Sequence, residues 1–269
     1  MAILTEKNST PSSHWYTEDG EPRHFIGRVK DGELRPTTLR DARKERLYPS
    51  ITSILGVMEK ETLKRWQFRQ IAFAASRQPI EPNESEDYFI ERVMTNAFQV
   101  TSDAADLGTQ IHAAIEAKLA GEHFDPNMDT YVDPALEWLD ESMIEAVELE
   151  KVVVDRENGF AGTCDYIGRA ANGTPIVLDW KSRKTKPGAA VKSWDGQMMQ
   201  IAGYAKAYWG QNVNVAGANV VISTTEPGRV EVIRYTPRQL NKAYQALTQL
   251  CAVWRYIKGY DPRKDNDNE

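Results

Sequence analysis

The spacing of apolar residues changes at about residue 147. Before that point they recur about every three or four residues, which is the spacing of one helix face. After it they gather in short runs rich in valine, isoleucine and tyrosine, separated by Asn-Gly turns. The pattern therefore predicts a helical first half, followed by a second half that contains the strands of a sheet.

Helices are expected in the first half after a polar segment of 48 residues that holds only strand-like pieces, such as 24–29. They are predicted over residues 48–76, 86–100, 101–120 and 134–145, with a loop at 79–85. Ser50 or Thr52 is suited to cap the first helix, and Ser102 the third. Gly121 stands where a left-handed residue would end that third helix.

Three strands are expected next, joined by tight turns in a meander. They are predicted over residues 147–155, 160–170 and 174–182, with turns at 157–159 and 171–173. A helix at 194–209, strands at 217–225 and 229–236, and a helix at 237–256 complete the chain. Pro237 suits the first turn of that last helix. The order predicts an α+β core with a helical addition before it.

Composition narrows the class of protein. The 269 residues are 41% hydrophobic and 27% charged, as in globular proteins. The sequence shows no secretory signal and no apolar run long enough to span a membrane, so we expect a cytoplasmic protein without membrane contact. Cys164 and Cys251 are too few and too far apart for a zinc site or a four-cysteine iron–sulfur cluster.

Charge gives a mixed indication about nucleic acid. The net charge of −6 and the pI of about 5.4 count mildly against DNA binding. Net charge is only a sum, however, and DNA responds to the local field and to bound cations. Two segments are locally basic, at 35–46 and 181–192.

Asp165, Asp179 and Lys181 form the candidate chemical centre. The Asn-Gly hairpin can bring the two aspartates side by side, and residues two apart in a strand share a face. Two carboxylates can hold one or two Mg²⁺ ions, which stabilise charge on a phosphate and activate a water. A neighbouring lysine can orient or deprotonate that water. The alternative is a simple Asp179–Lys181 salt bridge, since the decoy triplet 116–118 shows that D/E-x-K arises by chance.

His112 is the next candidate, on the helix predicted at 101–120. Glu116 lies one turn later, so the two side chains share a face. Such a pair can bind metal, or it can be a hydrogen-bonded pair without further function.

Four short motifs follow one another in the sequence. They are a G-x-x-x-H helix at 108–112, a G-x-x-D strand at 162–165, a D-x-K strand at 179–181 and a Q-x-x-x-Y helix at 200–204. In this order they resemble the RecB-like branch of the PD-(D/E)xK nuclease superfamily, which includes phage exonucleases. The resemblance covers roughly residues 101–210.

The resemblance implies a role for each matching residue. His112, Asp165 and Asp179 would be ligands of Mg²⁺ or Mn²⁺, together with the backbone carbonyl of Trp180, and Lys181 would assist the attacking water. Gln200 and Tyr204 would orient the DNA strand. Apart from the resemblance, Ser182, Arg183 and Lys184 could bind phosphates, because their basic loop directly follows the strand that carries Asp179. Two alternatives remain. The residues at 200 and 204 also fit an ordinary core helix, and the basic loop also fits a solvated surface.

The resemblance also implies a fold and a division of the chain. It is a restriction-endonuclease-like αβββαβ core, with a mixed central sheet flanked by helices and an N-terminal helical subdomain. The expected parts are a polar segment and helical subdomain at 1–100, the nuclease core at 101–260 and a disordered tail at 261–269. The four-cysteine iron–sulfur cluster of some relatives is not expected, and no phosphate-binding loop of a helicase motor occurs.

The expected function is metal-dependent exonuclease action on DNA, at a single strand or a duplex end. It would serve recombination, repair or DNA turnover of a phage or mobile element, inside a bacterial host cell. A recombination or single-strand-binding protein could be its partner. Two alternatives stay open: a structure- or sequence-selective endonuclease on the same fold, and a non-catalytic nucleic-acid-binding or assembly module.

Overall fold

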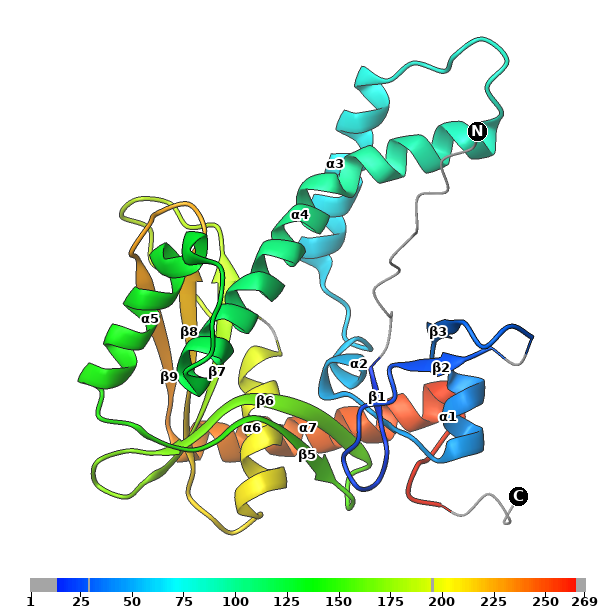
Figure 1. Cartoon of the computed structure of the whole chain (residues 1–269). Coiled ribbons are helices and arrows are strands. Elements are labelled where there is room, and N and C mark those ends of the chain that lie inside the picture. Colours follow the sequence, from blue (N-terminus) through cyan, green and yellow to red (C-terminus); the bar gives the residue numbers. More distant parts are fainter. Residues whose placement is uncertain (1–13, 29, 195, 265–269) are drawn as a thin grey trace.

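The computed structural model describes residues 14–28, 30–194 and 196–264. Its centre is a five-stranded sheet in the order β5-β6-β7-β8-β9 (Figure 1). The strands are β5 (Glu145–Asp155), β6 (Phe160–Arg169), β7 (Pro175–Arg183), β8 (Ala216–Ser223) and β9 (Val230–Tyr235). The β7–β8 pair is parallel and the other three pairs are antiparallel, so the sheet is mixed, as expected.

Helices cover both faces of this sheet because its strands bury apolar side chains on both sides. In β7, Val177 packs in one cluster with α6 (Gln197–Trp209) and α7 (Pro237–Lys258). Leu178 and Trp180 belong to the opposite cluster, with the C-terminal half of α4 (Glu86–Ala120) and with α5 (Asp129–Glu141). A short 3-10 helix, η1 (Pro126–Met128), joins those two helices. The sheet is the middle layer of an α/β/α sandwich.

The N-terminal segment packs against the sandwich. It contains β1 (Trp15–Tyr16), β2 (Phe25–Gly27), β3 (Leu34–Pro36), α1 (Leu39–Glu45), β4 (Tyr48–Pro49) and α2 (Ile51–Leu55). β1 pairs with β4 and β2 with β3, in two small antiparallel sheets. Trp15, Ile51 and Ile54 lie in the same apolar cluster as α6 and α7. The sequence pattern missed α1, although Thr38 and Asp41 form a capping box at its start.

A helical arm projects from this body. It consists of α3 (Glu61–Arg77) and the first part of α4, residues 86–99, which run side by side and away from the sheet (Figure 1). None of the residues of α3 is buried. The arm and the sandwich are joined through α4, which is a single helix of 35 residues.

Three of the predicted helix boundaries are wrong. The helix expected at 48–76 is broken after α2, where Gly56 ends the helix that Ser50 caps. The helices expected at 86–100 and 101–120 are one, and Ser102 is not a cap, because a Gln99–Asp103 side-chain hydrogen bond supports the helix across the junction. α5 begins at Asp129, so Pro134 lies inside it.

Other expectations are confirmed. Gly121 ends α4 in the left-handed conformation, and Pro237 opens α7. The meander, both of its turns and the following strands are present, with ends shifted by a few residues. The expected boundary between residues 100 and 101 falls inside α4. Of the expected tail, Asp261 accepts hydrogen bonds from Arg263, whereas 265–269 lie outside the described residues. Among the described residues, no helix has the length and apolarity needed to cross a membrane.

Candidate functional site

β6 and β7 diverge at a group of residues that we call the notch, namely His112, Glu150, Asp165, Asp179 and Lys181. The backbone pairing of the two strands runs from Arg169–Pro175 to Tyr166–Leu178 and stops there, although both strands continue. The next residues toward the open end are Asp165 and Asp179. The Trp180 backbone N–H donates to Asp165 Oδ2 at 2.8 Å, in place of a ladder bond between the strands. The expected side-by-side placement of the two aspartates is therefore present, with their side chains at the point of divergence.

Asp179 is completely buried, and its carboxylate is held by two donors. Lys181 Nζ lies 2.6 Å from Oδ2, so the salt bridge that the sequence allowed does form. Asn219 Nδ2 on β8 donates to the same oxygen at 2.7 Å. Tyr235 OH donates to Asn219 Oδ1 at 2.6 Å and also hydrogen-bonds Ser193. A chain of polar contacts thus connects the loop after β7 to the carboxylate.

The environment of Asp165 disfavours its negative charge. Burial and the charge of Asp179 raise its pKa well above the usual range of a carboxyl, although the charge of Lys181 opposes the shift. The side chain is only 12% exposed, which explains the size of the desolvation effect. Lys181 responds in the opposite direction: burial disfavours its charge, but Asp179 and Asp165 more than compensate and raise its pKa. The notch therefore holds more carboxyl groups than one lysine can neutralise, and the raised pKa of Asp165 favours its protonated form.

Glu150, which the sequence analysis missed, adds to this excess. It lies in β5 between Leu149 and Lys151, whose pairing partners in β6 flank Asp165. Burial and the charges of Glu116 and Asp179 raise its pKa to about 7. Its φ of 44° is uncommon for a residue other than glycine, and such strain often marks functional positions. Its place inside an ordinary strand pattern gave no signal in the sequence.

His112 reaches the notch from α4. Its Nδ1 lies 3.6 Å from Asp165 Oδ2, and 31% of the side chain is exposed. Burial and the charge of Lys181 lower its pKa, so the imidazole is neutral at pH 7 and can act as a ligand. Glu116, one turn later on the same helix, affects the site through its charge on Glu150. Neutral histidine beside several carboxylates is a donor set that suits a divalent cation.

The glycines of the first two motifs allow close approaches between elements. A Cβ on Gly108 of α4 would lie 2.6 Å from the Ser182 hydroxyl on β7. A Cβ on Gly162 of β6 would lie 2.8 Å from the ring of Tyr204 on α6. Both contacts would force a shift, so each glycine brings a helix down onto the strands that carry the aspartates. The motif spacing thus reflects packing around the notch.

The Q-x-x-x-Y pair lies beneath this packing. Tyr204 is 4% exposed and belongs to the apolar cluster of α6 and α7. Gln200 Nε2 donates to its hydroxyl at 3.0 Å, and burial raises the pKa of the phenol well above its usual value. The core alternative therefore describes Tyr204, which supports β6, while Gln200 is partly exposed beside it.

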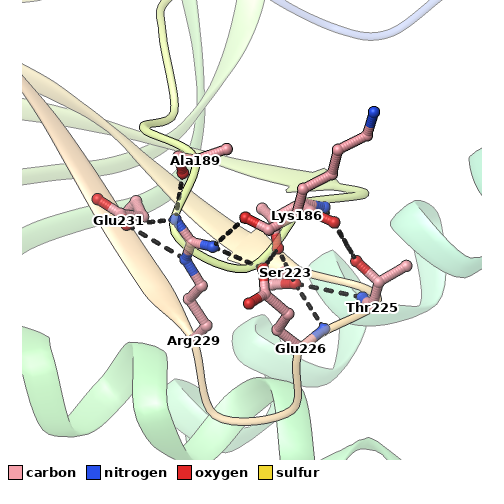
Figure 2. A network of polar contacts seen from close by, with 8 residues as sticks. Lys186, Ala189, Ser223, Thr225, Glu226, Arg229 and Glu231 are labelled. Carbon is pink, nitrogen blue, oxygen red and sulfur yellow. Dashed lines mark hydrogen bonds and ion pairs between the residues drawn. The ribbon is translucent and has the colours of Figure 1, made fainter.

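The basic loop after β7 is held in a defined shape. Arg183 stacks on Trp194 at 4.0 Å and donates to the Lys192 carbonyl, so it fixes the loop rather than facing solvent. Figure 2 shows a second tie, in which Arg229 donates to the carbonyls of Lys186 and Ala189. Lys184 is exposed between the two ties and is free to meet a phosphate.

Arg229 is itself oriented by two carboxylates. Glu226 lies 2.6 Å from its Nη1 and Glu231 2.8 Å from its Nη2. Ser223 accepts from the backbone of Thr225 and Glu226 and closes the turn between β8 and β9 (Figure 2). The loop is therefore anchored to the turn between β8 and β9.

No three His, Cys, Asp or Glu side chains of the described residues stand ready in a metal-binding geometry. The reason is visible in the contacts: the carboxylate of Asp179 is turned to Lys181 and Asn219, and that of Asp165 to a backbone N–H. The donor types are suitable, but the side chains would have to turn to bind a cation.

Asn219 and Tyr235 are further site residues that the sequence analysis missed. A single asparagine stands in the apolar run of β8 and is completely buried. A buried amide is costly without partners, so an isolated asparagine in such a strand is a usable signal for a polar partner nearby. Tyr235 had no comparable signal, because tyrosine is common in strands.

Comparisons with known proteins add little. No family model matches the sequence, and no curated protein matches it. Among solved structures, the chain is similar to one described as "Crystal structure of SSO0001". The sequence identity is 17%, the alignment covers 76% of this chain and 89% of the other, and the TM-score is 0.36. A similarity of that size carries no argument about function.

Proposed function

We propose that this protein is a metal-dependent nuclease of the PD-(D/E)xK type, acting on DNA as an exonuclease. One observation carries the proposal: residues from three separate motifs converge on the notch. Asp165 and Asp179 meet where two strands diverge, Lys181 pairs with the second aspartate, and His112 reaches the first. Chance occurrences of short motifs give no reason for such convergence.

The acidic excess supports a divalent cation at the notch. The raised pKa values of Asp165 and Glu150 show that carboxylates crowd together with one lysine among them. His112, Asp165 and Asp179 would hold the cation, with the Trp180 carbonyl as a further oxygen ligand. A bound Mg²⁺ or Mn²⁺ would offset this charge, attract a phosphate and lower the pKa of a water.

The side chains of Lys181, Asn219 and Lys184 would position the water, the Asp179 carboxylate and the DNA phosphates. Lys181 now pairs with Asp179; if that carboxylate held a cation, the ammonium group of Lys181 would be free to orient the attacking water and face the phosphate. Asn219 keeps one oxygen of Asp179 in place through its amide. Lys184 on the anchored loop neutralises a neighbouring phosphate.

The test compares end-labelled linear single-stranded DNA with internally labelled closed circular single-stranded DNA. Each is incubated with the protein in Mg²⁺, Mn²⁺ or EDTA. Metal-dependent loss of the linear DNA alone is the expected result, because an exonuclease needs an end. Cleavage of the circle would identify an endonuclease on the same site. Intact DNA in both metals, with duplex substrates also intact, would overturn the proposal in favour of a binding module.

A further inference from the structure

The helical arm carries an open groove that its own fold does not fill. The groove has a volume of about 480 Å³ and is lined by residues of one face of α3, namely Trp66, Arg69, Gln70, Phe73 and Arg77. Trp66 is 39% exposed and Phe73 46% exposed. The other lining residues follow Trp66 at spacings of three, four, seven and eleven residues, which places the set along one face of the helix. Exposed aromatic rings in a row are unusual on a surface that nothing covers.

The charges of the groove are also distinctive. Its lining includes no acidic residue. Arg69 and Arg77 stack on the Phe73 ring at 5.4 and 5.9 Å, and neither forms an ion pair within the described part of the chain. Other cations of the arm are paired, for example Lys64 with Glu59 and Arg92 with Glu84. Two arginines without a carboxylate partner therefore lie beside the exposed rings and can meet an incoming anion.

Aromatic rings interleaved with unpaired arginines are the arrangement that binds single strands of nucleic acid. Bases stack on the rings, whatever their identity, and guanidinium groups meet the phosphates between them. The groove has no carboxylate to pair with these two arginines. A protein partner or a second copy of the chain would therefore have to supply carboxylates in order to bury them. Charge complementarity favours a polyanion with flat apolar groups.

We propose that the arm groove binds single-stranded DNA. Trp66 and Phe73 provide the stacking surfaces, and Arg69 and Arg77 turn from the Phe73 ring to contact phosphates when the strand binds. Trp66 contacts Phe98 of α4, and that same helix carries His112. The rise of a helix over the intervening residues is about 21 Å, so the groove would hold the strand at a distance from the notch. This inference deepens the proposed function, because it names the substrate that the notch would cleave.

The test measures binding of a labelled oligothymidylate by fluorescence anisotropy in EDTA, so that cleavage plays no part. We expect the double variant Trp66→Ala/Phe73→Ala to bind at least about tenfold more weakly, because stacking on each ring is lost. Binding should also quench tryptophan fluorescence in the wild type and less so in Trp66→Phe. Unchanged affinity and unchanged quenching would overturn the proposal.

A charge variant gives an independent reading. Arg69→Gln/Arg77→Gln should bind more weakly and lower the slope of log affinity against log salt by roughly 1.4, the effect of two lost phosphate contacts. The matched controls lie on the opposite side of α3: Phe68→Ala, whose ring is 69% exposed, and Lys64→Gln. Both controls should bind as the wild type does. Equal losses in control and groove variants would contradict a specific groove.

The two proposals fail in different ways. A protein that cleaves DNA, but whose groove variants bind and cleave as the wild type does, retains the nuclease and loses the arm groove. A protein that leaves DNA intact in both metals, but whose groove variants lose oligothymidylate binding, retains the groove and loses the nuclease. Circular dichroism with thermal unfolding verifies that each variant is folded.

Discussion

The arm and the notch handle aromatic and charged side chains in opposite ways. At the notch, Trp180 is fully buried and Asp179 has two donors on its carboxylate. On the arm, Trp66 and Phe73 are exposed, and Arg69 and Arg77 lie over the Phe73 ring without an ion pair among the described residues. The notch is built into a packed sandwich, whereas the arm presents exposed aromatic and cationic groups. The comparison suggests that one region does the chemistry and the other holds the substrate.

Removing one carboxylate charge from the notch and one from the arm should give the largest difference between the two regions. Asp179→Asn is expected to reduce DNA cleavage by about 10³-fold, because it removes a cation ligand and the partner of Lys181. Glu84→Gln removes a carboxylate of the arm, which pairs with Arg92, and should leave the cleavage rate within about twofold. Initial rates in Mg²⁺ measure both. Equal rates for the two variants would show that the notch is not the reactive centre.

Truncating one tryptophan at each place should separate packing from binding. Trp180→Ala is expected to cost about 3–5 kcal/mol of unfolding free energy, because it leaves a cavity between β7 and α4. Trp66→Ala should cost about 1 kcal/mol or less, because much of that ring is already in water. Urea unfolding followed by circular dichroism gives both values. Similar costs would mean that the arm is a packed part of the core.

Sequence reasoning was most successful where local signals and packing agree. Asn-Gly turns fixed the meander, and the alternation within β7 placed Asp179 and Lys181 on one face. It failed at α4, because the polar residues around Ser102 look like a helix start although a side-chain bond carries the helix through. Glu150 was missed because its position opposite Asp165 depends on strand register, which a sequence pattern does not give.

The arm groove also lay beyond sequence reasoning. The run that forms α3 was expected to be helical, but a helical pattern with aromatic residues ordinarily indicates a buried face. Only the structure shows that Trp66 and Phe73 stay partly exposed. Only the structure also shows that the groove around Arg69 and Arg77 is lined by no carboxylate, because the lining depends on which residues are neighbours in space.

The anchored loop offers a third, more local test of how rigid the notch is. Arg229→Ala should loosen the loop, since its guanidinium holds the carbonyls of Lys186 and Ala189 (Figure 2), while Thr185 stays bonded to Ser223 and Thr225. Limited trypsin digestion is expected to cut after Lys184 several times faster in the variant, with little change in global unfolding. Cleavage at the wild-type rate would show that the loop is held in another way.

The smallest effect concerns pH and the packed N-terminal segment. The Arg35 guanidinium, followed by the Thr38 contacts, holds the pKa of Asp41 well below its usual range. A depressed pKa stabilises the fold above the unfolded value of about 3.9; the stabilisation declines below that value and is lost only as the pH falls through the lower pKa of the folded state. Asp41→Asn should therefore lower the urea midpoint most at about pH 7, and progressively less as the pH falls below about 3.9. A difference that stays constant with pH would contradict this ion pair.

The central claim is that the notch hydrolyses DNA with a divalent cation, and Lys181 tests it most directly. The measurement is single-turnover cleavage of linear DNA in Mg²⁺ and in Mn²⁺ by the wild type, by Lys181→Ala and by the control Lys242→Ala, which changes an exposed lysine of α7. The account predicts cleavage by the wild type and the control, and a loss of about 10³-fold or more in Lys181→Ala with its fold and DNA binding retained. Cleavage at the wild-type rate by a folded Lys181→Ala protein would contradict it.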